Sequence, residues 1–162
     1  PNPETMKITL LVIGKTSTAS IAAGIDDYAG RVNRYIPFDI QILPDARASR
    51  SMTEARQKEA EGKLILGAIK PGDRLVLLDE RGSELTSRQF SEMLERRAHT
   101  VAKRLVFAVG GPYGFSDEAY ARADEKLSLS KMTFPHELVR LFFVEQLYRA
   151  QTISRGEPYH HD

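Results

Sequence analysis

The stretch Leu127-Ser128-Leu129-Ser130-Lys131-Met132-Thr133-Phe134-Pro135-His136 lies where a short apolar-polar strand passes into the last helix of the chain. Pro135 is typical of the first turn of a helix, because its missing N–H would have no intrahelical partner there. Many hydrogen-bonding groups, several of them hydroxyls, therefore converge near a helix N-terminus. By itself, His136 in this first turn is more often a structural residue than a catalytic one.

Alternating strand and helix patterns lead up to this stretch. Short apolar runs predict strands at Lys7–Ile13, Phe38–Leu43, Arg74–Leu78, Arg104–Val109 and Lys126–Ser130. Helical periodicity and capping signals predict helices over 20–34, from a Ser51/Glu54 capping box to about Ile69, from a Thr86/Gln89 capping box to about His99, after Ser116 or Asp117, and from Pro135 to about Gln151. This order predicts an α/β fold, a parallel-type sheet flanked by helices.

Ligands of open parallel sheets bind at the carboxyl ends of the strands. The loops expected there are Leu78–Gly82, Gly110–Gly114 and Ser130–Phe134. Asp79, Glu80 and Glu84 near the first loop allow either acid–base or metal chemistry, or simply solvated charge. The glycines of the second loop allow close backbone approach to a ligand, or simply a tight turn.

The last predicted helix carries apolar residues around nearly its whole circumference, from Leu138 to Tyr148. A helix of this kind must be buried on all sides. Two arrangements satisfy that requirement, a central core helix or a helix covered partly by a second subunit.

Length and composition limit the number of domains and the class of protein. The 162 residues suffice for one domain, and 41% hydrophobic content supplies one core. We expect Pro1–Thr5 to be a mobile leader or an added remnant, and residues 6–162 to form the domain. Cysteine is absent, so no thiolate metal site is possible, and the apolar runs are shorter than the roughly 20 residues of a membrane span. A cytoplasmic protein without membrane association is expected, and a net charge of +1 does not by itself predict RNA binding.

Two nucleotide-binding motifs fail. Gly14-Lys15-Thr16 lacks the glycine that a phosphate loop needs five residues earlier, where Thr9 stands. Gly110–Gly114 lacks the spacing of the dinucleotide fingerprint. The tail Gly156–Asp162 is either part of an affinity tag or a segment whose aromatic and histidine side chains contact a base.

Four motifs together carry a resemblance to a known family: Val109–Gly111, Leu127–His136, Leu147–Ala150 and Arg155–His160. With this order and spacing, the chain from Met6 to Asp162 resembles the ribosomal RNA large subunit methyltransferase H family of the SPOUT superfamily. The resemblance implies a C-terminal trefoil knot, S-adenosylmethionine as cofactor, no metal, and a homodimer with the last helix at its interface. It also implies methylation at N3 of a pseudouridine in helix 69 of 23S ribosomal RNA, in the assembled ribosome.

The resemblance also implies two groups of site residues. Arg149 would stabilise negative charge on the uracil ring or hold a phosphate, Tyr159 would stack on or position the base, and His160 is a candidate proton acceptor. The predicted cofactor-binding residues are Leu78, Gly110, Leu129, Ser130, Lys131, Met132, Thr133 and Phe134.

Other functions stay open at this point. A knotted methyltransferase acting on transfer RNA would share the fold and cofactor. A ribosome-binding protein without catalysis would keep the sheet, and a generic nucleotide-binding domain is disfavoured by the failed glycine motifs.

Overall fold

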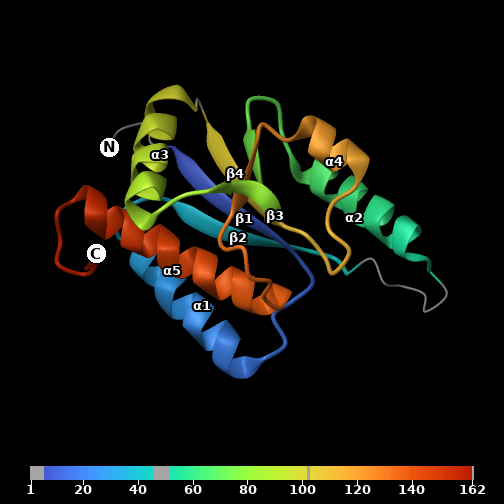
Figure 1. The fold of residues 1–162 in the computed structure, drawn as a ribbon, viewed down its shortest axis with the longest axis horizontal. Helices are drawn as coiled ribbons and strands as arrows, with labels where there is room; N and C mark the ends of the chain where they lie inside the picture. Colours follow the sequence, from blue (N-terminus) through green and yellow to red (C-terminus); the bar gives the residue numbers. More distant parts are fainter. Residues whose placement is uncertain (1–5, 46–51, 102, 162) are drawn as a thin grey trace.

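Strands and helices alternate along the chain in the computed structural model, which describes residues 6–45, 52–101 and 103–161 (Figure 1). The strands are β1 (Lys7–Ile13), β2 (Phe38–Leu43), β3 (Arg74–Glu84), β4 (Arg104–Val109) and β5 (Glu125–Ser128). The helices are α1 (Ala19–Val32), α2 (Glu54–Ala68), α3 (Ser87–Thr100), α4 (Asp117–Arg122) and α5 (His136–Ser154). The expected leader Pro1–Thr5 lies outside the described residues.

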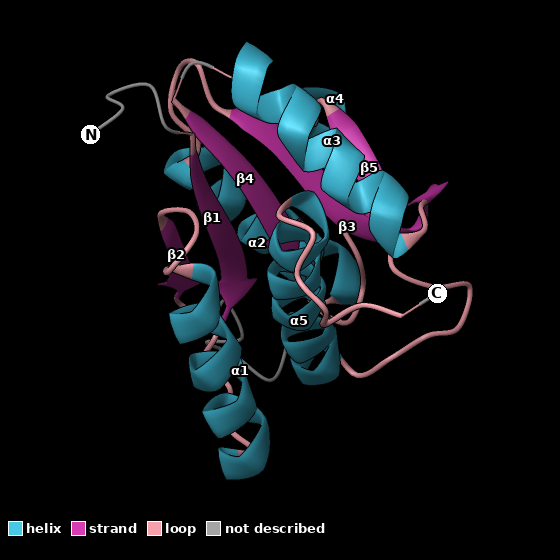
Figure 2. Ribbon diagram, turned by 90° about the vertical axis from the view of Figure 1, so that its left-hand side faces the viewer, coloured by secondary structure: helices cyan, strands magenta, loops and turns pink. Residues whose placement is uncertain are grey.

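The strands form one parallel sheet, which confirms the predicted α/β class (Figure 2). Their order is β2-β1-β4-β3-β5, and every neighbouring pair runs parallel. Because all strands point the same way, the irregular part of β3 at residues 79–82 and the loops that follow β4 and β5 lie at one edge of the sheet. The three predicted ligand loops therefore lie at the same end of the sheet.

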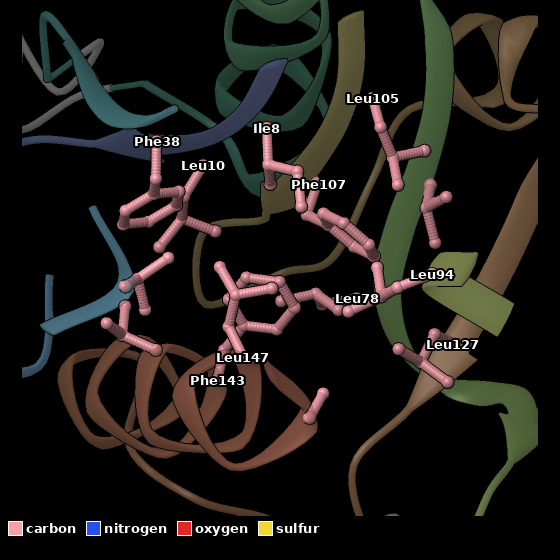
Figure 3. Packing of buried hydrophobic residues seen from close by; sticks show 14 of the residues in the cluster. Ile8, Leu10, Phe38, Leu78, Leu94, Leu105, Phe107, Leu127, Phe143 and Leu147 are labelled. Carbon is pink, nitrogen blue, oxygen red and sulfur yellow. The ribbon is translucent and has the colours of Figure 1, made fainter. Parts of the chain in front are cut away.

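Each face of the sheet carries its own apolar core, since successive strand residues point to opposite sides. On one face, Ile8 and Phe107 pack with Phe143 and Leu147 of α5, and α1 and α3 complete the layer (Figure 3). On the other face, Leu11 and its neighbours pack against α2 and α4. Both faces are covered, which explains the nearly continuous apolar runs of β3 and β4.

The largest difference from the sequence prediction concerns β3. We expected a strand ending at Leu78 and a loop to Leu85, but β3 continues to Glu84. Leu78 and Ser83 both pair with Leu127 of β5, so residues 79–82 bulge out between two paired segments. The bulge is possible because Gly82 has no side chain, and a Cβ there would lie 2.6 Å from the backbone nitrogen of Leu127.

Helix ends differ more modestly from the prediction. The Thr86/Gln89 capping box is present, and Ser116 caps α4. The N-cap of α2, however, is Thr53, whose hydroxyl accepts from the Arg56 N–H, whereas Ser51 lies outside the described residues. Pro135 caps α5 rather than filling its first turn, and its carbonyl accepts from Leu138 and Val139. Other boundaries differ as well: α1 is Ala19–Val32 instead of 20–34, α5 runs to Ser154, beyond the expected Gln151, and β5 is Glu125–Ser128 instead of Lys126–Ser130.

The apolar helix α5 lies across the sheet, between α1 and α3. Phe143, Val144 and Leu147 are fully buried against the strands, and Leu141 contacts α1 so closely that a Cβ at Gly24 would lie 3.0 Å from it. Phe142 remains 38% exposed. The core-helix interpretation is confirmed for most of the circumference, and the subunit interface stays a prediction.

Candidate functional site

The carboxyl edge of the sheet holds a cavity of about 870 Å³. This volume falls within the usual range of small-molecule sites, roughly 300–1,000 Å³. Its walls come from the β3 bulge, the loop after β4 and the loop between β5 and α5. These are the segments that sheet geometry predicted for ligand binding.

The loop between β5 and α5 is held open by its own hydroxyl groups. The Ser128 hydroxyl donates to the Ser130 carbonyl at 2.8 Å, and the Ser130 hydroxyl accepts from the Met132 N–H at 3.0 Å. These bonds keep the segment from continuing as strand or helix. Met132, 75% exposed, and Thr133 thus lie at the cavity, ahead of the α5 N-terminus.

The loop after β4 is shaped by its glycines. A Cβ at Gly110 would lie 3.1 Å from the Phe115 ring, and a Cβ at Gly111 would collide with the buried Glu61 carboxylate. Gly114 has φ +82°, a conformation that side chains disfavour. Only glycine lets the backbone lie this deep, so at this wall of the cavity a ligand meets main-chain groups.

The β3 bulge is held by a polar cluster of Asp79, Arg81 and Tyr120. Asp79, whose side chain is 6% exposed, accepts a hydrogen bond from the Tyr120 hydroxyl and another from the Arg81 N–H at 2.8 Å. Burial opposes ionisation of Asp79, but these hydrogen bonds outweigh it and lower its pKa. The Arg81 guanidinium donates to the Tyr120 hydroxyl and lies 4.9 Å over its ring. The cavity wall therefore carries a carboxylate and a cation in fixed positions.

The predicted cofactor-binding residues gather at this cavity with one exception. The lining includes Leu78, Gly110, Leu129, Ser130, Met132, Thr133 and Phe134. Lys131 does not line it. Its side chain is 88% exposed and its ammonium lies 3.9 Å from the Glu84 carboxylate, on the outer side of the loop.

The other predicted group, Arg149, Tyr159 and His160, also comes together. The tail after α5 folds back, so that Arg149 Nη1 lies 3.1 Å from His160 Nδ1 and the guanidinium lies 4.8 Å over the Tyr159 ring. Glu145, one helical turn before Arg149, accepts from its Nε at 3.0 Å and from its Nη2 at 3.1 Å. This hydrogen bonding raises the pKa of Arg149, so the guanidinium stays charged.

Tyrosines of α1 and α5 hold the tail in place. The Tyr159 ring packs edge-on against Tyr148, with 4.7 Å between centroids, and its hydroxyl lies 3.4 Å from that of Tyr28. Burial and the Tyr28 contact raise the pKa of Tyr159, which is therefore a neutral phenol at physiological pH. Glu157 accepts a 2.6 Å hydrogen bond from the Tyr35 hydroxyl and fixes the turn.

The tail cluster and the main cavity lie apart within one chain. None of Arg149, Tyr159 and His160 lines the cavity. Thirteen residues separate His136, at its edge, from Arg149, which corresponds to about 20 Å along α5. A smaller pocket of about 290 Å³ is lined by Glu145 and Gln146 and shares Leu127–Ser130 with the main cavity.

Sequence reasoning missed Glu145 and Tyr120 and did not assign Asp79 to the site. The spacing of Glu145 to Arg149 is the i,i+4 interval of helical ion pairs, so this partner was available as a signal. Asp79 was noted, but solvated charge was favoured for it. Its pairing with Tyr120, 41 residues away, arises only when the bulge meets α4.

The described residues contain neither a metal-ligand cluster nor a membrane-spanning helix. In 6–45, 52–101 and 103–161, no group of three or more histidines and carboxylates is arranged to hold a metal ion. Across the same residues, none of the helices combines the length and apolar character needed to cross a bilayer.

Comparison with known proteins gives consistent matches. A family model described as predicted SPOUT methyltransferase matches residues 6–160. The chain is 57% identical over 157 residues to the ribosomal RNA large subunit methyltransferase H of Parabacteroides distasonis, covering 97% of this chain and 100% of that protein. The same coverage applies to its counterpart from Bacteroides thetaiotaomicron, at 52% identity. The protein of that name from Christiangramia forsetii is 52% identical, over 96% of this chain and 99% of its own.

Proposed function

The chain belongs to the SPOUT methyltransferase family, and from that premise we propose that it methylates N3 of a pseudouridine in helix 69 of 23S ribosomal RNA. The chain is an RNA methyltransferase. We propose the assembled ribosome in the cytoplasm as its substrate, and residues 6–162 as one catalytic domain. The observation that carries the proposal is the cavity, whose walls are formed by the segments that the family resemblance implies.

S-adenosylmethionine would supply an electrophilic methyl group on a positively charged sulfur. The cavity residues fit this cofactor. Leu78, Leu129 and Phe134 offer apolar walls for an adenine ring, while Gly110 and Gly111 allow main-chain groups to approach the ligand. The ionised Asp79 lies beside the Arg81 guanidinium, so the wall offers charged groups of both signs to a ligand that carries a sulfonium and a carboxylate. The trefoil knot that the resemblance implies stays a prediction.

We propose that a second copy of the chain completes the site. Within one chain, Arg149, Tyr159 and His160 do not line the cavity, yet the resemblance gives them contact with the acceptor base. A homodimer with α5 at its interface would bring the tail of one subunit to the cavity of the other. The exposed ring of Phe142, which packs edge-on against Phe134 beside the cavity, supports this arrangement.

In that arrangement the protein contributes alignment and electrostatics. Methyl transfer requires N3 of the base to approach the methyl carbon at about 3–3.5 Å along the line of the breaking bond. Tyr159, held by Tyr148 and Tyr28, offers a fixed aromatic surface for the base. The charged Arg149 would stabilise negative charge on the uracil ring as the N3 proton leaves.

The substrate assignment is tested by incubating unmodified ribosomes with protein and S-adenosylmethionine and mapping the RNA by mass spectrometry. One added methyl group in helix 69 is the expected product. Free 23S RNA and transfer RNA are assayed in parallel. Modification of transfer RNA alone would replace the proposed substrate, and no modification of any RNA would contradict the assignment.

The cofactor assignment is tested separately by calorimetric titration with S-adenosylmethionine. Replacing Thr133 with Arg places a long side chain at the cavity, and we expect at least a tenfold loss of affinity. Thr100→Arg, an exposed threonine near the end of α3, is the matched control and should bind normally. Equal affinities of both variants would place the cofactor elsewhere.

A further inference from the structure

In the hydrogen bond between Arg149 and His160, the chemistry of the two groups decides which one is the donor. A guanidinium carries only N–H donors and stays protonated in proteins. Across the 3.1 Å between Arg149 Nη1 and His160 Nδ1, the arginine must therefore donate and the imidazole nitrogen must accept. A neutral imidazole has one nitrogen with a lone pair and one with a proton. Accepting at Nδ1 places the proton on Nε2.

Glu145 holds the Arg149 guanidinium in the orientation in which it donates to His160. Its two oxygens accept from Nε and Nη2 of Arg149 at 3.0–3.2 Å, so the guanidinium cannot turn without losing a bidentate pair. The Tyr159 ring below the guanidinium restricts it further, at 4.8 Å. Nη1 is consequently aimed at His160. The Glu145 side chain is only 17% exposed, which shields the pair from water.

We propose that Glu145 and Arg149 lock His160 in the Nε2-protonated tautomer, so that His160 serves the reaction as a hydrogen-bond donor and not as the base. This inference rests on the proposed function for its substrate and revises the role of proton acceptor expected from the sequence. Glu145 is a positioning residue, which acts through Arg149 and does not itself touch the base.

The chemical step balances without a histidine base. The N3–H bond breaks and its proton passes to water, and the N3 lone pair then forms the bond to the methyl carbon. The carbon–sulfur bond breaks with its electron pair going to sulfur, which leaves as a neutral thioether. Negative charge that spreads from N3 onto the neighbouring carbonyl oxygens would accept a hydrogen bond from His160 Nε2–H.

The tautomer is measured on the protein alone, by nitrogen NMR of ¹⁵N-histidine-labelled protein. The two ring nitrogens have distinct shifts according to which carries the proton. His160 is assigned by difference from His160→Gln, and the exposed His161 serves as internal reference. We expect one tautomer, protonated at Nε2, for His160. Protonation at Nδ1, or an average of the two forms, would overturn the lock.

Two variants test the positioning role. Glu145→Gln removes the anion and one acceptor, and Arg149→Lys cannot satisfy Glu145 and His160 together because it has a single nitrogen. Both should return His160 to a mixture of tautomers and lower kcat while leaving the KM for S-adenosylmethionine unchanged. If His160 stays protonated only at Nε2 in both variants, Glu145 and Arg149 do not determine its tautomer.

The donor role is tested by amide substitution. The glutamine side-chain N–H₂ can stand near the position of Nε2–H but cannot take up a proton, so His160→Gln should keep kcat within about tenfold, against a loss of about 10²-fold for His160→Ala. His161→Gln is the matched control. If His160→Gln is as slow as His160→Ala, the donor role is wrong. Absence of RNA methylation by the unmodified protein would refute the proposed function, while the NMR result would still decide the tautomer.

Discussion

At the scale of single residues, the cavity depends on positions where a side chain is either absent or fully partnered. Gly82, Gly110 and Gly111 let main chain pack against main chain or against buried rings and carboxylates. Asp79 and Tyr120 pair across the bulge of β3. These residues share little sequence signal, because each is defined by what lies opposite it in space. Substitutions at these positions should therefore destabilise the protein, even where the change in side-chain size is small.

Gly82→Ala should destabilise the protein. Its Cβ would lie 2.6 Å from the backbone of Lys126 and Leu127, which cannot move aside as a side chain end can. We expect a loss of about 1–3 kcal/mol in the free energy of unfolding, measured in urea. Gly30→Ala is the matched control. Nothing lies within 4 Å of that position in α1, so a gain of about 0.5–1 kcal/mol is expected. Equal effects at both positions would contradict the packing of the bulge.

At the scale of elements, α5 organises the molecule. Its buried face covers the central strands, its first turn anchors α1, and its last turns hold the tail cluster. Arg140 donates to the carbonyls of Ile13 and Gly14 at the end of β1, and burial lowers the pKa of its guanidinium. Glu137 accepts from the backbone and hydroxyl of Ser17. One helix thus fixes the sheet edge, the neighbouring helix and the proposed catalytic group.

Two adjacent phenylalanines of α5 should differ sharply in their contribution to stability. Phe143 is fully buried and stacks on Phe107, so Phe143→Ala should cost about 3–5 kcal/mol of unfolding free energy. Phe142 is 38% exposed, and Phe142→Ala should cost clearly less. Chemical denaturation at protein concentrations that keep the oligomeric state constant would measure both. A similar loss in the two variants would refute the orientation of α5.

The contact between α5 and α1 should make stability depend on acid pH. Hydrogen bonds from Ser17 and Thr18 lower the pKa of Glu137 from 4.5 to about 2. A carboxylate whose pKa is lower in the folded state stabilises the protein above the unfolded value, and this contribution is lost as pH falls. Glu137→Gln should therefore lower the melting temperature near neutral pH, and the difference from the unmodified protein should shrink between pH 4.5 and pH 2.

The exposed Glu95 of α3 supplies the control for this experiment. Glu95→Gln should leave the pH profile of the melting temperature nearly unchanged, since that side chain lies in solvent. Thermal unfolding followed by circular dichroism across this pH range would separate the two variants. If the melting temperatures of Glu137→Gln and the unmodified protein differ by the same amount at every pH, the hydrogen bonds from Ser17 and Thr18 do not lower the pKa of Glu137.

At the scale of the whole molecule, the described chain holds two parts of one proposed site at separate places. The cavity lies at the carboxyl edge of the sheet, and the tail cluster lies toward the far end of α5. A symmetric dimer would unite them twice, since a twofold axis gives each subunit the same contact. Sedimentation at micromolar concentration should accordingly give a dimer, and a monomer would contradict this arrangement.

Mixing two inactive variants tests whether the subunits share sites. Thr133→Arg impairs the cavity and His160→Ala impairs the tail, so at a limiting concentration of S-adenosylmethionine each homodimer should keep at most about a tenth of the unmodified activity. Co-expressed chains that assemble at random form heterodimers in which one site keeps both parts intact. About a quarter of the unmodified activity is then expected. Activity no higher than that of the separate variants would place the tail and the cavity of each site in the same chain.

Periodicity and turn residues alone predicted the strands, most helices and the parallel sheet. They succeed because apolar spacing reflects which side of an element faces the core, and that is a local property. They failed at β3, where pairing resumes after the bulge because β5 lies beside it, and at Ser51, which local spacing could not distinguish from the actual cap Thr53. The residues of the site came from family motifs, since hydroxyl-rich loops have no unique structural meaning.

By itself, the sequence determined the fold class, the edge of the sheet that holds the cavity and the residues that we propose for each half of the site. Only the tertiary structure decided which groups touch: that Asp79 meets Tyr120, that Lys131 turns outward, and that Arg149 donates to His160. The physical reason is the distance along the chain over which each kind of interaction acts. Burial patterns repeat locally along the chain, whereas a side-chain contact forms only where chain folding brings the two groups together.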